Sequence, residues 1–284
     1  MRVLITGASS GIGAALARAY AAQGAQVYLL ARRAAALEAV RQSLPEPNRH
    51  QIFVADVTVA ASLQQAAQAC LSTGVPDIVI ANAGVSVGTL TEYADDLQAT
   101  EEVIQTNLLA LIRTFQPFIQ PMKARGGGTL VSIASVAGIR GLPGAGAYSA
   151  AKAAVIAYTE SLRVELRGSG IEVVTLAPGY IRTPMTAHNP YPMPFMLDAD
   201  EFARRAQREI ARGTSYTVIP WQMGVVAKGL RLLPNWLYDR LFQHAGRKPR
   251  AHELAAYQTH AQAHTNSHTN NQANSGAAAH HDAP

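Results

Sequence analysis

The chain alternates between short apolar segments and longer segments of helical periodicity, and this alternation constrains the fold more than any other feature of the sequence. The apolar segments are nearly continuous in Val, Ile and Leu, which is typical of strands buried on both faces of a parallel sheet. We predict strands at 3–5, 26–31, 52–55, 77–81, 129–133, 172–176 and 217–219. We predict helices between them at 13–23, 34–44, 60–72, 100–118, 148–167 and 199–212.

Strands and helices that alternate in this way form βαβ units, so the sequence predicts an α/β fold with a doubly wound parallel sheet of about seven strands. The carboxyl ends of such strands lie along one edge, where ligands bind. With 284 residues, of which 48% are hydrophobic and 15% charged, the composition is globular and supports one large core. We expect a single domain over 1–220 and a C-terminal helical extension over 221–249.

Residues 183–198 interrupt this pattern with four prolines among Tyr191, Met193, Phe195 and Met196. The segment contains too much proline for a regular helix or central strand, yet it is too apolar for a solvated linker. We therefore expect a lid over an apolar substrate pocket, extending over 183–212. The alternative is a loop that packs on the core without a role in binding.

From residue 250 onward the composition changes to Ala, His, Asn, Gln, Thr and Ser, with six of the nine histidines of the chain. So little apolar surface would not offset the entropy of ordering, and we predict a disordered low-complexity tail over 250–284. Metal binding by these histidines is the alternative. Since no fixed ligand spacing accompanies them, we expect no metal site.

A single cysteine, Cys70, rules out an intrachain disulfide, and we expect a small buried thiol there. The sequence passes from Met1 directly into the first predicted strand without the apolar run of a secretory leader. Nor does it contain the run of about 18 apolar residues that spans a bilayer. We expect a cytoplasmic protein.

A glycine-rich segment, Thr-Gly-Ala-Ser-Ser-Gly-Ile-Gly at 6–13, joins the first predicted strand to the first predicted helix. Glycine permits a tight turn and lets a pyrophosphate approach the backbone amides at a helix N-terminus. Its place in an opening βαβ unit favours a Rossmann-type dinucleotide-binding domain. The residues expected to bind the cofactor here are Gly7, Ser9, Ser10, Gly11, Ile12 and Gly13.

The end of the second predicted strand indicates which dinucleotide is bound. An NAD-binding domain carries an acidic residue there for the ribose 2′-hydroxyl. This chain has Ala31 followed by Arg32 and Arg33, and an arginine can pair with a 2′-phosphate. We therefore predict NADP(H). The alternative is that the arginines are solvated charges at the start of the next helix.

Tyr148 and Lys152 are four residues apart and so lie on one face of a predicted helix. A nearby ammonium favours phenolate, so Lys152 should bring the pKa of Tyr148 toward the working pH. Ser135 follows the fifth predicted strand at the ligand-binding edge, where its hydroxyl could hold a carbonyl oxygen. The three residues predict proton transfer to or from a substrate oxygen.

With these motifs in order, the sequence resembles the short-chain dehydrogenase/reductase family, in its compact, non-extended branch. The matches are TGxxxGxG at 6–13, Asp56-Val57, Asn82-Ala83-Gly84, Asn107, Ser135, Tyr148 with Lys152, and Pro178-Gly179 with Thr183. The resemblance implies that Tyr148 is the general acid in reduction and the base in oxidation. It implies that Lys152 also binds the nicotinamide ribose and that Ser135 orients the substrate.

The resemblance also implies roles for the remaining matched residues. Asn107 would hold a water that links Lys152 to solvent, and Asp56 and Val57 would contact the adenine. Six further residues would surround the central and nicotinamide parts of the cofactor: Asn82, Ala83, Gly84, Pro178, Gly179 and Thr183. Two simpler readings stay open: Asp56 could cap a helix, and Pro178-Gly179 could form a turn after a strand.

The extension over 221–249 departs from the family pattern. It combines an apolar helical stripe, interrupted by Pro234, with aromatic residues, and residues 221–250 hold six basic residues and one acidic residue. It could pack on the core or cover the pocket, contact a second subunit, or lie on a membrane surface. A homodimer through the helices at 100–118 and 148–167 is a further possibility. We expect no nucleic-acid partner, because the basic segment is short.

Together these features predict an NADP(H)-dependent oxidoreductase whose partner is a small carbonyl or alcohol substrate. The apolar lid favours reduction of an apolar ketone or aldehyde. The alternatives are an NADP-linked alcohol dehydrogenase working in the oxidative direction and a non-catalytic dinucleotide-binding regulator. The presence of Ser135, Tyr148 and Lys152 together disfavours the regulator.

Overall fold

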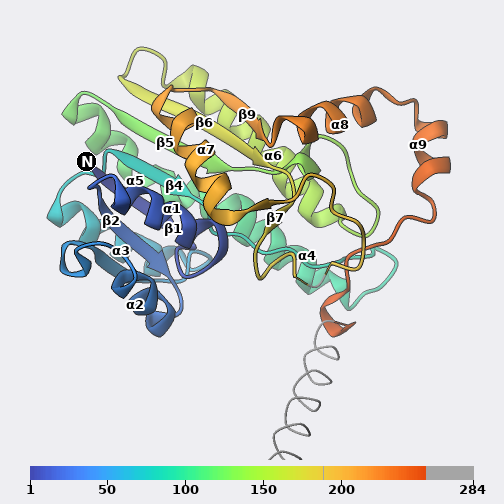
Figure 1. The fold of residues 1–284 in the computed structure, drawn as a ribbon, viewed down its shortest axis with the longest axis horizontal. Coiled ribbons are helices and arrows are strands. Elements are labelled where there is room, and N and C mark those ends of the chain that lie inside the picture. Colours follow the sequence, from blue (N-terminus) through green and yellow to red (C-terminus); the bar gives the residue numbers. More distant parts are fainter. Residues whose placement is uncertain (188, 254–284) are drawn as a thin grey trace, which may run out of the picture.

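A computed structural model describes residues 1–187 and 189–253, and its centre is a seven-stranded parallel sheet in the order β3-β2-β1-β4-β5-β6-β9 (Figure 1). The predicted doubly wound α/β fold is therefore confirmed. The strands are β1 (Arg2–Thr6), β2 (Gln26–Ala31), β3 (Gln51–Val54), β4 (Ile78–Ala81), β5 (Gly128–Ile133), β6 (Ile171–Pro178) and β9 (Tyr216–Ile219). Outside the sheet, β7 (Ile181–Arg182) pairs with β8 (Leu197–Asp198).

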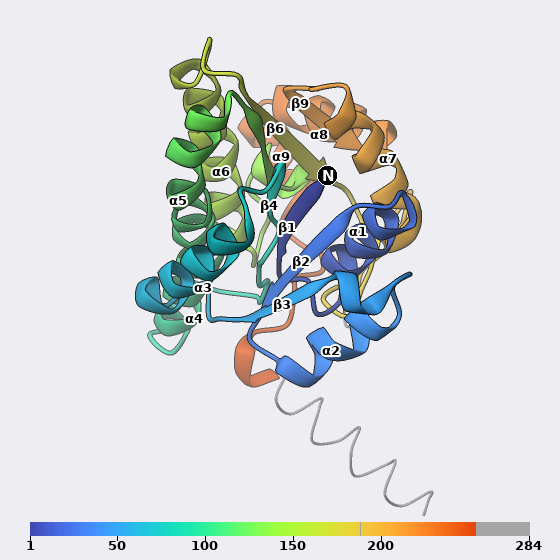
Figure 2. The ribbon, with the colours of Figure 1, turned by 90° about the vertical axis from the view of Figure 1, so that its left-hand side faces the viewer.

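Helices cover both faces of the sheet (Figure 2). The helices are α1 (Gly11–Ala22), α2 (Ala34–Gln42), α3 (Ala60–Thr73), α4 (Asp96–Ile104), α5 (Ala110–Arg125), α6 (Gly146–Glu165), α7 (Ala199–Ala211), α8 (Trp221–Leu232) and α9 (Asn235–Phe242). One core layer joins the sheet to α1, α2 and α7, and the other joins it to α3, α5 and α6. The near-continuous apolar strands are explained by this burial from both sides.

The strand order reverses beside β1, because β1 pairs with β2 on one side and β4 on the other. The crossovers after β1 and β4 therefore leave in opposite directions and open a crevice at the carboxyl ends of these strands. Thr6 ends β1 and Ala81 ends β4 at this crevice. The topology thus places the glycine-rich segment and the residues after β4 side by side.

The helix expected over 100–118 is interrupted in the structure. It consists of α4, a π-helical turn over Gln105–Leu109, and α5. A π-helical turn inserts an extra residue into the helix and occurs frequently at functional sites. Asn107, whose special role was predicted, lies in this turn and is 1% exposed.

The C-terminal extension forms α8 and α9, separated at Pro234, where a proline is expected to break a helix. The predicted tail begins at residue 250, but residues 250–253 lie on the body of the protein, and Arg250 is buried. An ion pair with Asp96, which sequence spacing does not reveal, holds Arg250 there. The rest of the predicted tail, 254–284, lies outside the described residues.

Candidate active site

The glycine-rich segment forms a loop between β1 and α1 in which two glycines have backbone angles that disfavour other residues. Gly7 has φ +67° and Gly11 has φ +54°. Gly13 is restricted by space instead, since a Cβ there would lie 2.3 Å from the Gly7 carbonyl oxygen. The loop therefore keeps its backbone amides at the N-terminus of α1 open to an anionic ligand.

Arg33 extends from the end of β2 to this loop. Its Nη2 donates to Ser9 Oγ at 3.2 Å and to Ser10 Oγ at 3.4 Å. Arg32 is exposed, and its Nη1 lies 3.8 Å from Asp56 Oδ2. Two guanidinium groups therefore border the glycine-rich loop, while Ala31 at the strand end contributes no carboxylate.

Asp56 follows β3 and forms a turn rather than a helix cap. Its Oδ1 accepts hydrogen bonds from Thr58 N at 2.9 Å and Thr58 Oγ1 at 2.6 Å. Burial of Asp56 tends to raise its pKa, but the bonds from Thr58 and the charge of Arg32 outweigh burial and lower the pKa. Asp56 therefore carries a negative charge at neutral pH. Helix α3 begins later, after Val59.

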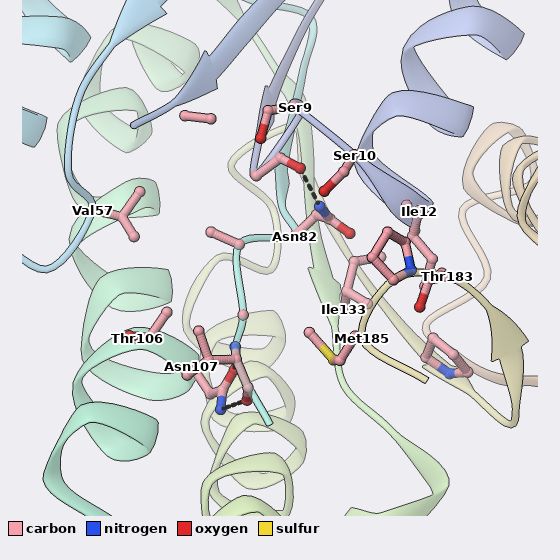
Figure 3. A pocket seen from close by; sticks show the side chains of 18 of the residues that line it. Ser9, Ser10, Ile12, Val57, Asn82, Thr106, Asn107, Ile133, Thr183 and Met185 are labelled. Carbon is pink, nitrogen blue, oxygen red and sulfur yellow. Dashed lines mark hydrogen bonds between the residues drawn. The ribbon is translucent and has the colours of Figure 1, made fainter. Parts of the chain in front are cut away.

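Thr6 joins the loop after β4 to the glycine-rich loop, and sequence reasoning gave it no role. Its buried hydroxyl accepts hydrogen bonds from Asn82 N at 3.0 Å and Ala83 N at 3.1 Å. In return Asn82 Nδ2 donates to the Thr6 carbonyl at 2.9 Å. The pair fixes both sides of the crevice, and Figure 3 shows the Asn82 side chain between them. The place of Thr6 at the start of the glycine motif was the available signal.

Asn107 holds the chain beyond Gly84 through both ends of its amide. Its Oδ1 accepts from Val85 N at 3.0 Å, and its Nδ2 donates to Val85 O at 2.8 Å (Figure 3). A Cβ at Gly84 would lie 2.7 Å from Asn107 Oδ1 and 3.8 Å from Lys152 Nζ. Asn107 is thus next to Lys152, as its expected role requires. The water relay itself stays a prediction.

Lys152 lies on α6 with its ammonium buried beneath the strand end. The side chain is 4% exposed in all, its Nζ donates to the Ile133 carbonyl at 2.8 Å, and Nζ lies 5.7 Å from the centroid of the Tyr148 ring. Burial lowers the pKa of Lys152 to about 8. The lysine is therefore still mostly protonated at neutral pH and close to its titration point.

The pKa of Tyr148 is shifted in the direction opposite to the one expected from the sequence. Burial raises this pKa, and the Ser135 hydroxyl opposes the rise. The expected lowering by Lys152 is not found, because removal from water penalises the phenolate more. Ser135 is itself held at the end of β5, where its Oγ accepts a hydrogen bond from Ala137 N at 3.1 Å. Tyr148 therefore stands as a protonated phenol at neutral pH.

These residues surround one cavity of about 320 Å³. It is lined by all the predicted site residues except Gly13, which is buried beneath the glycine-rich loop. Thr183 comes from the predicted lid, and a Cβ on Gly11 would lie 3.3 Å from its Cγ2. Figure 3 shows Thr183 and Met185 bordering the same space as Ser10 and Asn82. The lid segment therefore meets the glycine-rich loop across the cavity.

Several lining residues were missed from the sequence. These are Thr58, Val85, Thr106, Ile133, Ile181, Pro184, Met185 and Thr186, together with Ala55 and Ala134, which each follow the end of a strand. Thr58 and Thr106 directly adjoin predicted site residues, and Met185 falls within the predicted lid, so adjacency was the available signal. Ala55 and Ala134 gave no such signal, because an alanine shows that a ligand can come close to the backbone only once the fold is known.

No group of three metal-ligating side chains is found within 1–187 and 189–253. No helix in that part of the chain has both the length and the apolar composition needed to cross a bilayer.

Known proteins are similar to this chain in sequence and in fold. The family model described as short chain dehydrogenase matches residues 1–192. An uncharacterized oxidoreductase of Myxococcus xanthus is 36% identical over 242 residues, which cover 83% of this chain and 94% of the relative.

Solved structures give the same result. A short-chain dehydrogenase from Streptomyces avermitilis is 26% identical with a TM-score of 0.70, over 80% of this chain and 92% of that chain. A variant of actinorhodin polyketide ketoreductase, determined with NADPH, is 27% identical with a TM-score of 0.69, over 77% and 95% of the respective chains. Sequence, fold and cavity agree, and the chain belongs to the short-chain dehydrogenase family of oxidoreductases.

Proposed function

We propose that the protein transfers a hydride between NADP(H) and a carbonyl or secondary alcohol carbon, and that it reduces an apolar ketone or aldehyde. The observation that carries the proposal is that Ser135, Tyr148 and Lys152 line the same cavity as the glycine-rich loop. A dinucleotide bound along that loop would present its far end to these three side chains. The proposed catalytic residues are these three together with Asn107.

The residues of the cavity fit a phosphorylated dinucleotide. Gly7 and Gly11, with their positive φ angles, give the glycine-rich loop the turn that leaves its backbone amides at the N-terminus of α1, where a pyrophosphate would lie. Arg33 and Arg32 border the loop where the 2′-phosphate of NADP(H) would lie, and the guanidinium group suits a phosphate. The match to a ketoreductase determined with NADPH also favours this cofactor.

The remaining residues that line the cavity would contact successive parts of the cofactor, from the adenine to the nicotinamide. Asp56 and Val57 would hold the adenine, Asn82, Ala83 and Gly84 the central part, and Pro178, Gly179 and Thr183 the nicotinamide. The pairing of Asp56 with Arg32 fits a shared position beside the adenosine. NADPH supplies the hydride when it is bound.

The protein residues supply the proton and orient the substrate. Because burial raises its pKa, Tyr148 keeps its proton at neutral pH and can donate it from Oη to the carbonyl oxygen. The Lys152 ammonium beside the ring then stabilises the phenolate electrostatically. Ser135 Oγ would hold the same carbonyl oxygen. The apolar side chains of the lid, among them Met185, would exclude water from the reacting carbon.

The test measures how fast the wild type and Tyr148→Phe oxidise NADPH in the presence of a generic diketone. The readout is the loss of absorbance of the reduced nicotinamide. We expect the variant to lose about 100-fold or more in kcat while it still binds NADPH. Tyr158→Phe is the matched control, since Tyr158 lies on the same helix but outside the cavity. Unchanged activity in Tyr148→Phe would overturn the mechanism.

The rival functions give different results in the same assay. A dehydrogenase that works mainly in the oxidative direction would turn over secondary alcohols with NADP⁺ at a higher kcat/KM than the matching ketones with NADPH. A non-catalytic regulator would bind NADPH and turn over neither class of substrate.

We also propose that α8 and α9 contact an anionic membrane surface. Trp221, Val225 and Leu232 are 68%, 62% and 84% exposed and lie at i, i+4 and i+11, so they form one solvent-facing stripe on α8. On α9, Trp236 is 70% exposed. Exposed apolar residues of this size gathered on two successive helices mark an interaction surface.

The charge beside this apolar stripe favours an anionic lipid surface over a protein partner. Lys228, Arg231 and Arg240 are exposed on the same two helices, and Asp239 is the single acidic residue there. Tryptophan and basic residues together are typical of helices that lie in the interface of a membrane. A second copy of the chain is the alternative occupant of the stripe.

A further inference from the structure

The last described residues, 246–253, form a strap that lies across the loops beside the catalytic end of the cavity; we call it the C-terminal strap. Gly88 N donates to the Pro249 carbonyl at 2.9 Å, and Gly88 forms a parallel bridge with Arg250. A Cβ on Gly144 would lie 2.6 Å from Arg247 Cβ. The strap therefore contacts both the loop after β4 and the loop before α6. Figure 1 shows the chain after α9 turning back toward α4.

A buried ion pair holds the strap in place. Arg250 Nε lies 2.8 Å from Asp96 Oδ2, with the side chains 10% and 4% exposed. The Arg250 guanidinium also lies 3.9 Å from the centroid of the Tyr93 ring. Asp96 Oδ2 further accepts a hydrogen bond from Leu90 N at 2.8 Å. These bonds fix the strap and the loop over 85–95 to each other.

The strap begins beside the lid segment. A Cβ on Gly246 would lie 3.4 Å from Tyr191 Cβ, so the strap begins against the lid. The Tyr191 ring centroid lies 6.3 Å from that of Tyr180, and burial together with the neighbouring phenols of Tyr180 and Tyr148 raises the pKa of Tyr191 to about 12. The strap thus contacts the lid at its start and, through Pro249, the loop after β4 that also carries the cavity residue Val85.

Lys248 is the side chain of the strap that the structure leaves without an anionic partner. Its Nζ donates to Ser86 Oγ at 2.8 Å, and Ser86 directly follows the cavity residue Val85. Within residues 1–187 and 189–253, the ion pairs do not include Lys248. Burial lowers the pKa of Lys248 to about 8.

A partly buried ammonium that is bound only to a neutral hydroxyl loses hydration without gaining an anion, and this desolvation is unfavourable. The bond from Lys248 to Ser86 is therefore a weak means of fixing the loop over 85–95. The loop does not need it, since the Pro249 carbonyl and the Arg250–Asp96 pair already fix it. A cation placed there suits a ligand that brings the missing negative charge.

We propose that the C-terminal strap forms a wall of the substrate site and that Lys248, with Ser86, binds a carboxylate group of the substrate. One ammonium and one hydroxyl match a monoanion, whereas a phosphate dianion would call for more donors. Since the lid is apolar, the substrate class is an oxo acid with an apolar body. The inference rests on the proposed carbonyl reduction for the reacting end of that substrate.

The test compares a ketone that carries a terminal carboxylate with its methyl ester, at equal chain length, in the wild type and in Lys248→Met. We expect the wild type to prefer the acid in kcat/KM, through a lower KM. Lys248→Met should reduce this preference about tenfold to a hundredfold, as loss of a charged hydrogen bond does. Lys228→Met is the matched control, since Lys228 is an exposed lysine on α8, and it should keep the preference.

Binding of a saturated carboxylate of the same length, measured by titration calorimetry with and without NADPH, makes the test independent of turnover. Tight binding to the wild type and loss in Lys248→Met, without turnover of either ketone, would support the carboxylate site and contradict the proposed reaction. No binding to the wild type, no preference for the acid, or an equal loss for acid and ester in Lys248→Met would overturn the inference.

Discussion

Arg250 and Asp96 form a buried ion pair across 154 residues of sequence, with Nε and Oδ2 2.8 Å apart. The hydrogen bond from Arg250 is the largest cause of a lowered pKa at Asp96. An acid with a lowered pKa in the folded state stabilises the fold above its unfolded pKa, near 4, and this contribution is lost as the pH falls through the lowered value. The pair therefore links the C-terminal strap to the body at neutral pH and releases it in acid.

Arg250→Met is expected to lower Tm by several degrees, because it leaves Asp96 buried without its partner. It should raise KM for the ketone while leaving the Kd of NADPH within about twofold, since the strap borders the substrate end of the cavity. Arg240→Met, at an exposed position on α9, is the control and should change neither Tm nor the KM for the ketone. An equal loss of NADPH affinity in Arg250→Met would contradict the placement of the strap.

Arg33→Ala is expected to lower kcat/KM for NADPH about tenfold to a hundredfold with little effect on NADH, because it removes a guanidinium from the 2′-phosphate position. Ala31→Asp should also lower kcat/KM for NADPH and should raise it for NADH, since a carboxylate there repels the phosphate and suits the ribose 2′-hydroxyl. Arg41→Ala, on the same side of the fold but outside the cavity, is the control. Similar use of NADPH and NADH by the wild type would contradict the prediction.

The pKa of Lys152 predicts how kcat for reduction depends on pH. Its pKa of about 8 means that the ammonium is lost as the pH rises through that value, and kcat should fall with it. Lys152→Arg should remove this alkaline limb, because a guanidinium stays charged. Tyr148 does not limit the rate in that range, since its pKa is raised. An alkaline limb that persists unchanged in Lys152→Arg would contradict the assignment.

The same lysine predicts a gain in stability with pH. Its pKa falls from 10.5 to about 8 on folding, so between these values the unfolded chain binds more protons and the free energy of unfolding rises with pH. The buried ammonium costs about 3 kcal/mol below pH 8. Lys152→Met should therefore be more stable than the wild type at pH 7 in urea unfolding, although it is inactive. Lys248 contributes a slope of the same sign, which Lys152→Met retains.

The exposed apolar stripe predicts binding to vesicles. At low salt the wild type should sediment with vesicles rich in anionic lipid and stay in solution with zwitterionic ones, and Leu232→Ser with Trp236→Ser should weaken binding about tenfold or more. Val164→Ser, at a 62% exposed position on α6, is the control. A wild type that ignores anionic vesicles, or a dimer that the double variant dissociates, would contradict the membrane proposal.

Much of the cavity was predictable because the residues that line it lie within sequence motifs at the carboxyl ends of strands. The doubly wound parallel sheet follows from βαβ units, and the glycine-rich loop, Tyr148 and Lys152 follow from local spacing. The π-helical turn at Asn107 was not predictable, because helical periodicity does not reveal one inserted residue. Thr6 was missed for a similar reason, since its hydroxyl acts on a strand 76 residues away.

The sequence by itself determined the doubly wound sheet, the place of the site at its edge and the residue types available for hydride and proton chemistry, because these depend on local periodicity and on motifs of a few residues. Only the tertiary structure decided that burial raises the pKa of Tyr148, that Arg250 meets Asp96 and that Lys248 lies beside Ser86. Burial and contacts across a hundred or more residues depend on how all the layers pack, and packing is a property of the whole chain.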